Sequence, residues 1–341
     1  MRAARMGQND HRIDDGISGV TPPTDQARAF EAKASLTVII LTFNEHLHIR
    51  RCIESVQGLT QRVVVVDSGS TDDTVQIARS LGAEVLEHAF VNHAMQLNWA
   101  LEHAPIETEW VMRLDADEYP DATLRAALPT ALRQPGADIT GFEVRRPTTF
   151  LGKRIEHGGM APWLLRIWRR GQARSEERWM DEHMTLADGH VRRLPGRIVD
   201  HNLNTLTWWA DKHNRYANRE AVDLLLSREA AGRPEASALN RQAALKRWLK
   251  SRVYARLPLG VRPFVFWIYR IVFQLGFLDG ARGLMFHTLQ GLWYRLLVDG
   301  KVMEVERTMR TQGATLQAVV RDRLQIDLDA EAEPPQRKEQ S

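Results

Sequence analysis

The chain has 341 residues, 43% of them apolar, which is enough to bury one large core or two modest ones. Its formal charge of +3 is small for this length and excludes nucleic acid as the expected partner, so basic residues matter only where they cluster. The single cysteine, Cys52, excludes an internal disulfide and fits a reducing compartment; it falls on an apolar helix face, which favours a buried and inert thiol.

Both ends of the chain lack the apolar pattern of a folded core. Residues 1–34 mix charges with Gly and Pro and contain no apolar segment of the kind found in a secretory signal, so we expect a disordered tail and a cytoplasmic catalytic part. Residues 326–341 are charged and contain Pro, and we expect a second disordered tail there.

Residues 36–118 alternate between short apolar or β-branched runs and stretches with helical periodicity. Strands are predicted at 36–41, 63–66 and 83–86 and again from Trp110, with helices between them that end at Gly58, Gly82 and about His103. Repeated strand–helix units of this length predict right-handed crossovers and a mostly parallel α/β sheet covered by helices on both faces.

The run from Trp110 ends in Asp115-Ala-Asp117, with one residue between two carboxylates. At the end of a strand in an open sheet, alternate side chains point the same way, so these carboxylates can converge on one hard cation and leave ligand positions for a diphosphate. Acidic triplets are also common on loops and helix caps. The position at the end of a strand is therefore what favours a metal site.

Other polar residues follow the first two strands, at the edge of the sheet where ligands bind in open α/β folds. They are Thr42, Asn44, Glu45, Asp67 and Ser68. Each also has a structural explanation, because Asp and Ser satisfy amides in turns and at helix starts, and Thr or Asn can terminate a strand. Separate loops nevertheless bring polar side chains to one rim, which favours a binding site there.

Four stretches together resemble the inverting glycosyltransferase family 2, whose fold is GT-A. They are residues 37–45, residues 64–74, Gln96-Leu-Asn98-Trp-Ala-Leu101 and Leu114-Asp-Ala-Asp-Glu118. The sequence departs from the family pattern at Ser68, where many relatives carry a second acid, and at Leu97, where an Arg often precedes the asparagine.

The resemblance implies a role for each residue of the rim. It implies that Asp115 and Asp117 hold Mg²⁺ or Mn²⁺ on the diphosphate of a nucleotide sugar, and that Asn98 lies near the nucleoside. It implies that Thr42, Asn44, Glu45 and Asp67 line the nucleoside site. Ser68, at the position that departs from the family, is a further candidate for nucleotide-sugar binding.

A single displacement that inverts the sugar needs one carboxylate base within reach of the acceptor hydroxyl. Family members carry an acidic pair in the region of Trp179-Met-Asp181-Glu182-His183, so the resemblance implies Asp181 or Glu182 as the base. A solvated acidic turn beside Arg174 and Arg178 is the competing explanation. Arg166, in the strand-like run before this turn, can bind the donor diphosphate or an anionic acceptor, because a guanidinium matches phosphate oxygens bidentately.

Residues 151–226, which include Lys212-His-Asn-Arg-Tyr216, resemble the subgroup of lipopolysaccharide-core β-1,4-glucosyltransferases and other envelope-polysaccharide transferases. Residues 35–235 are therefore expected to form the GT-A domain. Its nucleotide-sugar-binding half is expected at 35–135 and its acceptor half at 136–235.

Residues 241–272 contain eight Lys or Arg and no Asp or Glu, interleaved with aromatic residues. This pattern predicts that residues 236–325 form a helical, amphipathic region on an anionic bilayer surface, with one more helix at 306–325. A span over 257–278 is not expected, since Arg262-Pro263 and Arg270 interrupt it. Packing of the aromatic residues against the catalytic domain is the alternative explanation.

The sequence therefore predicts a metal-dependent glycosyltransferase, peripheral at the inner face of the cytoplasmic membrane. Its donor would be a UDP-sugar such as UDP-glucose, and its acceptor a lipid-linked glycan or lipopolysaccharide core. One alternative is a sugar nucleotidyltransferase, which usually has a glycine-rich basic loop where this chain has Thr42-Phe-Asn-Glu45. The other is a non-catalytic, membrane-associated scaffold that keeps a nucleotide-binding shell.

Overall fold

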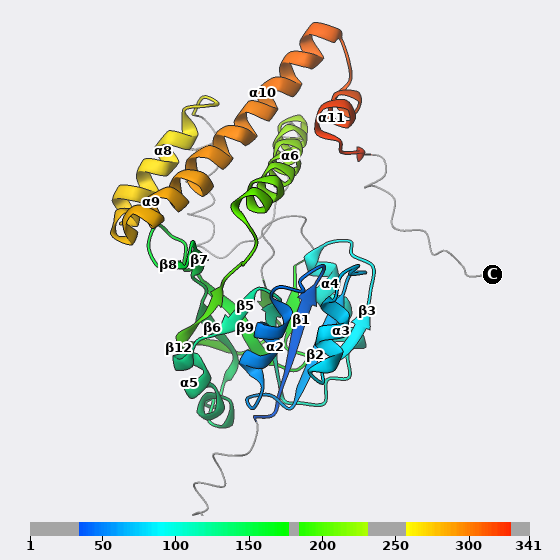
Figure 1. The fold of residues 1–341 in the computed structure, drawn as a ribbon, viewed down its shortest axis with the longest axis vertical. Coiled ribbons are helices and arrows are strands. Elements are labelled where there is room, and N and C mark those ends of the chain that lie inside the picture. The colour runs from blue at the N-terminus through cyan, green and yellow to red at the C-terminus, as the bar shows by residue number, and fades with distance from the viewer. Residues whose placement is uncertain (1–33, 177–183, 231–256, 329–341) are drawn as a thin grey trace, which may run out of the picture. The chain divides into compact units, whose positions relative to one another are not determined.

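The first half of the sheet is built from the strands that the sequence predicts (Figure 1). The computed structural model describes residues 34–176, 184–230 and 257–328. Strands β1 (Leu36–Thr42), β2 (Arg62–Asp67), β3 (Glu84–Glu87) and β4 (Trp110–Asp115) lie in the order β3-β2-β1-β4 and are all parallel. The connecting helices are α2 (Ile49–Val56), α3 (Thr74–Ser80) and α4 (His93–His103).

The residues of β1 alternate between two hydrophobic cores, one on each face of the sheet. Val38 and Ile40 pack with α2, whereas Ile39 and Leu41 pack with α4. Because both faces are covered, the whole strand is buried and reads in the sequence as one continuous apolar run. Cys52 of α2 is fully buried, as predicted, and burial raises the pKa of its thiol.

The second half of the sheet mixes parallel and antiparallel strands in the order β4-β9-β6-β12-β7-β8. Strand β12 also pairs with β5, which places Asp200 opposite Glu118 and so brings the end of β12 to the end of β4. Strands β10 and β11 form a separate antiparallel pair. The bounds are β5 (Glu118–Pro120), α5 (Ala122–Arg133), β6 (Ile139–Arg145), β7 (Thr148–Phe150), β8 (Lys153–Ile155), β9 (Trp163–Arg169), β10 (Ala173–Ser175), β11 (Met184–Leu186) and β12 (His190–Asp200).

A group of helices follows the sheet, and α6 packs lengthwise against α10 around a core of their own. The predicted single helix at 306–325 is wrong: α10 ends at Gln312, Gly313 takes the left-handed conformation at φ 63°, and α11 starts after the cap at Thr315. The bounds are α6 (Leu206–Ala230), α8 (Arg262–Ile268), the π-helical turn η2 (Tyr269–Phe273), the 3₁₀ turn η3 (Gly276–Asp279), α9 (Gly280–His287), the π-helical turn η4 (Thr288–Trp293), α10 (Tyr294–Gln312) and α11 (Leu316–Leu324).

No helix within residues 34–176, 184–230 and 257–328 is by itself long and apolar enough to cross a membrane. A sufficiently long and apolar stretch arises only when residues 262–273 and 276–312 are taken together, and these two segments are bent by 73° relative to one another.

A buried polar junction joins these helices to the loop between β8 and β9. The carboxylate of Asp279 accepts hydrogen bonds from the backbone N–H groups of Glu156 at 3.2 Å and His157 at 3.0 Å. The Arg270 Nε donates to the carbonyl of Gly158 at 2.9 Å, and the ring of His287 packs against Gly158 so closely that a Cβ there would clash. The loop is therefore fixed to η2, η3 and α9.

His287 gives this junction a pH dependence. Its side chain is fully buried, and burial together with the nearby Arg270 lowers its pKa from 6.5 to about 4. Below pH 6.5 the unfolded chain binds a proton that the folded chain does not bind until about pH 4. The contribution of His287 to the free energy of unfolding is therefore largest above pH 6.5, and it falls by about 3 kcal/mol as the pH drops to about 4.

We expect His287→Gln to remove this component of the pH dependence. Urea unfolding of wild type and variant between pH 7 and pH 4 measures it as the change with pH in the difference of their unfolding free energies. His190→Gln, at an exposed histidine of β12, is the matched control. Parallel losses in wild type and His287→Gln would rule out His287 as the titrating group.

Candidate active site

The loops after β1 and β2 are fastened to one another at the rim of the sheet. Asn44 adopts the left-handed conformation at φ 54°. Its backbone N–H donates to Ser70 Oγ at 2.8 Å, and its Oδ1 accepts from the Thr71 N–H at 2.8 Å. The N–H of Glu45 donates to Thr74 Oγ1 at 2.7 Å. These contacts bring two of the predicted loops into one surface.

Asp67 and Ser68 are engaged within the structure of this rim. The buried carboxylate of Asp67 accepts from the N–H groups of Gly69 at 2.9 Å and Ser70 at 2.7 Å, so it has the turn role that the sequence left open. Ser68 Oγ accepts from Gln96 Nε2 at 3.0 Å. Thr42 Oγ1 is buried and has no hydrogen-bond partner within the described part of the chain, so its hydroxyl retains capacity for a ligand.

Asn98 is used to hold the backbone next to the segment that carries the predicted base. Its Nδ2 donates to the Ser175 carbonyl at 3.0 Å, and its Oδ1 accepts from the Ser175 N–H at 2.9 Å. Both ends of the amide are therefore satisfied by protein. Asp181 and Glu182, together with His183, fall outside the described residues, which stop at 176 and resume at 184.

Asp115 lies among three guanidinium groups at the end of β4. Its carboxylate is 3.2 Å from Arg113, 3.6 Å from Arg166 and 4.0 Å from Arg146. Burial alone would raise the pKa of Asp115, but the three arginines outweigh it and hold that pKa far below its usual range. Asp115 is therefore ionised at any physiological pH.

Glu118 organises this group of charges. Its side chain is fully buried, accepts the Asp115 N–H at 3.0 Å, and lies 2.8 Å from the Arg166 guanidinium. It also accepts a hydrogen bond from Arg146 Nε. Two arginines from different segments are thus fixed beside Asp115 by one carboxylate.

Asp117 meets the polar end of β12. Its Oδ2 accepts from Asn202 Nδ2 at 3.1 Å, and its carbonyl accepts from the His201 N–H at 3.0 Å. The neighbouring Asp200 lies 3.1 Å from Arg146. Burial raises the pKa of Asp200 to about 6; Arg146 opposes this rise, and the nearby negative charges add to it.

Five of these residues were given no role by the sequence reasoning: Arg113, Glu118, Arg146, Asp200 and Asn202. The available signal was the polar run Asp200-His-Asn202 directly after an apolar strand end, the same arrangement that identified Asp115. Its place beside Asp117 depends on the pairing of β12 with β5, which no local pattern reveals.

The carboxylates at the rim suit a hard cation that a ligand helps to hold. Within the described residues, no three His, Cys, Asp or Glu side chains are gathered into a complete metal cage. Mg²⁺ is commonly held by one or two carboxylates, with substrate phosphates completing its octahedron. Asp115, beside Arg146, and Asp117, beside Asn202, are oxygen donors of that kind.

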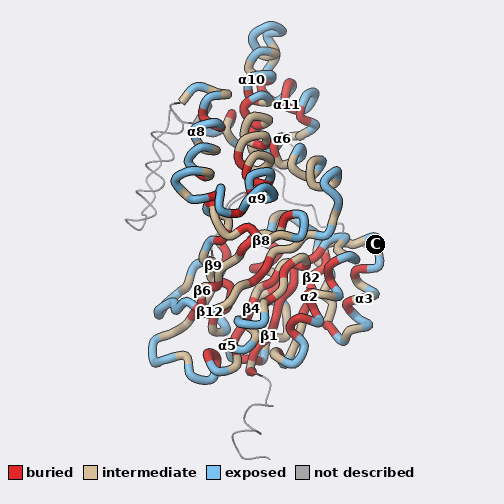
Figure 2. The backbone as a smooth tube through the Cα atoms, turned by 60° about the vertical axis from the view of Figure 1, so that its left-hand side comes forward, coloured by how far each residue is buried: buried red, intermediate tan, exposed pale blue. Residues whose placement is uncertain are grey.

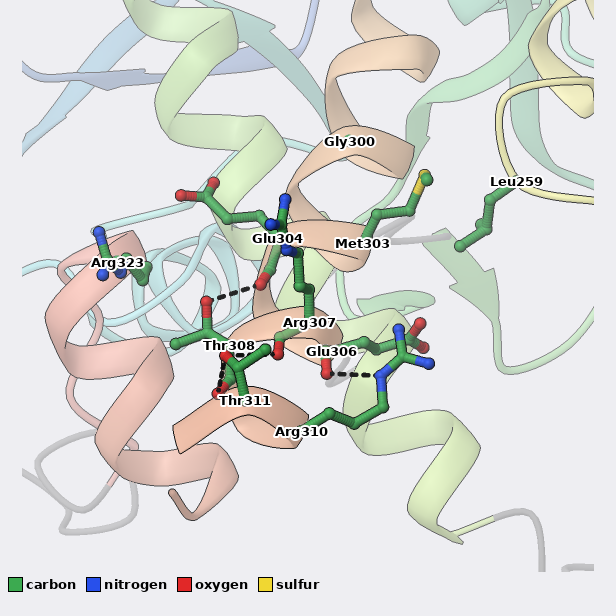
Figure 3. A pocket seen from close by; sticks show the side chains of 10 residues that line it. All are labelled: Leu259, Gly300, Met303, Glu304, Glu306, Arg307, Thr308, Arg310, Thr311 and Arg323. Carbon is green, nitrogen blue, oxygen red and sulfur yellow. Dashed lines mark hydrogen bonds between the residues drawn. The ribbon is translucent and has the colours of Figure 1, made fainter. Parts of the chain in front are cut away.

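A separate groove of about 760 Å³ runs along α10 (Figure 3). Thr308, Arg310 and Thr311 on its wall donate hydrogen bonds to carbonyls of α10 itself. The groove shares no residue with the rim, so we assign it no part in the candidate site.

The chain is similar in sequence to proteins of one described family. The model of the family "Glycosyl transferase family 2" matches residues 37–222. The lipopolysaccharide core biosynthesis glycosyltransferase LpsC of Rhizobium meliloti is 31% identical over 196 residues, covering 55% of this chain and 71% of LpsC. The succinoglycan biosynthesis protein ExoA of the same organism is 33% identical over 114 residues, covering 30% of this chain and 34% of ExoA.

Other similarities are shorter. The uncharacterized glycosyltransferase RP128 of Rickettsia prowazekii is 41% identical over 83 residues, which is 24% of this chain and 28% of that relative. A crystal structure of glucosyl-3-phosphoglycerate synthase from Mycobacterium tuberculosis with Mn²⁺, UDP and glucosyl-3-phosphoglycerate has 24% identity and a TM-score of 0.29, and the match covers 41% of this chain and 51% of that one.

The family match begins in β1 and extends into α6, so it includes every rim residue described above. It spans more than half of the sequence, and the mostly parallel, helix-flanked sheet agrees with the fold that the resemblance implies. The chain belongs to glycosyltransferase family 2.

Proposed function

We propose that the chain is a metal-dependent, inverting glycosyltransferase of envelope polysaccharide biosynthesis. Its donor would be a UDP-sugar such as UDP-glucose, and its acceptor a lipid-linked glycan or lipopolysaccharide core at the inner face of the cytoplasmic membrane. The observation that carries the proposal is the group of three arginines around Asp115 at the sheet rim of a family 2 chain. The roles named for LpsC and ExoA support the class of acceptor.

The arginines and carboxylates have complementary tasks in donor binding. Arg146 and Arg166 would bind oxygens of the donor diphosphate, since guanidinium groups match phosphate geometry and Glu118 already fixes both. The buried Arg166 Nε has no partner within the described residues and is available to such a ligand. Asp115 and Asp117 would hold Mg²⁺ or Mn²⁺, which supplies charge neutralisation for the departing diphosphate.

The acceptor would be activated by a carboxylate that removes its hydroxyl proton as the oxygen attacks the anomeric carbon. Asp181 or Glu182 is proposed for this role on the family resemblance. The contact between Asn98 and Ser175 supports it, because it fixes the chain just before the segment that carries both acids. Thr42, Asn44, Glu45 and Ser68 are proposed to surround the nucleoside, with Asp67 shaping their turn.

The metal role of Asp117 can be tested by UDP release. Purified protein given UDP-glucose and extracted envelope glycolipids should release UDP only with Mg²⁺ or Mn²⁺. Asp117→Ala should reduce this release on the order of a hundredfold or more, because the leaving diphosphate loses its neutralising charge. Circular dichroism should show an intact fold.

Asp138→Ala, at an exposed carboxylate before β6, is the control and should keep full release. Metal-dependent UDP release by Asp117→Ala at the wild-type rate would contradict the metal assignment.

A variant that keeps the positive charge of Arg166 but removes its planar guanidinium tests the proposed role of this side chain in diphosphate binding. Arg166→Lys keeps a cation beside Glu118 but loses the planar fork, so we expect UDP to bind on the order of tenfold more weakly in calorimetry with Mn²⁺. Arg169→Lys changes the same residue type on the same strand, at a site paired with Glu109, and should leave UDP affinity unchanged. Equal UDP affinity in Arg166→Lys and wild type would remove Arg166 from the donor site.

A further inference from the structure

The helices after residue 260 expose an unusually apolar surface. Elements α8, η2, η3 and α9 contact one another in sequence, and Figure 2 shows them largely exposed where the sheet strands are buried. Phe273 is the most exposed of their large apolar side chains, at 74%. We name this surface the apolar face; its principal residues are Phe264, Ile268, Val272, Phe273, Phe277 and Met285.

Of the Arg and Asp residues on these elements, Arg262, Arg270 and Asp279 are buried, whereas Arg282 of α9 is exposed and donates a hydrogen bond to the Leu151 carbonyl at 3.2 Å. Arg262 is 6% exposed and pairs with Asp299 on α10, with its Nε 2.8 Å from the carboxylate. Arg270 and Asp279 are 4% and 3% exposed and bind the loop that contains Gly158. A helix in contact with water usually shows the opposite distribution, with apolar residues inside and charges outside. The distribution here suits an apolar environment.

The backbone at the tip of the apolar face is also suited to that environment. The N–H of Gln274 donates to the Tyr269 carbonyl at 3.0 Å, and that of Leu275 to the Val272 carbonyl at 3.3 Å. The turn between η2 and η3 therefore keeps its amides paired where the chain bends. Within hydrocarbon no water is available to do so, and unpaired backbone groups would be costly.

Charge favours an anionic bilayer over an apolar protein as the occupant of this face. The sequence directly before it, residues 241–256, contains six Lys or Arg and no acid. Each such residue near an anionic lipid surface is attracted to it. Exposed apolar side chains on adjoining helical elements, preceded in the sequence by a basic segment, are typical of proteins that insert shallowly into one leaflet.

We propose that the apolar face of α8, η2, η3 and α9 inserts into one leaflet of an anionic bilayer without crossing it. This deepens the proposed function, because it specifies the side chains that would hold the enzyme at its lipid-linked acceptor. The buried polar junction connects these helices to the proposed diphosphate site. The loop that it holds continues to Pro162, whose carbonyl accepts the N–H of Arg146 at 2.9 Å. The proposed diphosphate site is therefore fixed relative to the inserted helices.

Flotation with phosphatidylglycerol-containing vesicles tests the insertion without donor or acceptor, so its result is independent of any transfer activity. Phe273→Asp should lower the vesicle partition coefficient of the full chain by about tenfold or more, because a charge replaces a large apolar side chain at the inserted surface. Val191→Asp places the same charge at an exposed valine of β12 and should partition like wild type. Unchanged partition of Phe273→Asp would overturn the proposal.

A second measurement reports where residue 273 lies when the protein is bound. Cys52 is the chain's single cysteine and is buried, so Phe273→Cys provides one exposed thiol for an environment-sensitive dye. The dye should shift to the blue and brighten with phosphatidylglycerol vesicles, whereas the same dye on Val191→Cys should not change. Vesicle binding without a shift at position 273 would show that another surface makes the contact, and a shift caused by self-association without vesicles would assign the face to a second copy; either result overturns the proposal.

Discussion

The rim of this protein depends on one fully buried carboxylate, that of Glu118. Removing a charge from water is costly unless ionic partners with good geometry replace the lost solvent, and Glu118 has two guanidinium partners together with the Asp115 N–H. These contacts tie the end of β4 to β9 through Arg166 and to the residue after β6 through Arg146. Without Glu118 the two arginines would repel one another beside Asp115, and the rim would have no fixed arrangement of charge.

The pKa values of two carboxyl groups at this rim shift in opposite directions. Asp115 faces three guanidiniums and stays ionised, whereas Asp200 has one arginine against burial and two nearby acids, so its pKa rises to about 6. The difference in pKa follows from position and not from residue type. An ionised Asp115 is the protonation state that a divalent cation requires, which connects the electrostatics of the fold to the proposed chemistry.

The sequence predicted those parts of the fold that local patterns determine. Strands β1 and β2 are continuous apolar runs because helices cover both faces of the sheet, and α4 ends at His103, where the sequence predicted its end. The break in the predicted helix at 306–325 had a visible signal in Gly313, which was not used. Arg146 has no such local signal, and the polar run at Asp200 does not reveal its neighbours, because strand pairings between distant segments bring both residues to Asp115 and Asp117. For Asp67 the sequence allowed both a turn and a ligand role, and its hydrogen bonds show the turn.

Two buried charges, Asp279 of η3 and Arg270 of η2, limit how the helices of the apolar face can move. To swing away from the sheet, η3 and η2 would have to leave Asp279 and Arg270 without the partners that now satisfy them, at a cost of several kcal/mol. The helices and the rim of the sheet should therefore move as one body, with little freedom to change the distance between them. If the apolar face inserts as proposed, the rim would lie at a constant height above the bilayer. The enzyme would then select acceptor sugars by their distance from the lipid that carries them.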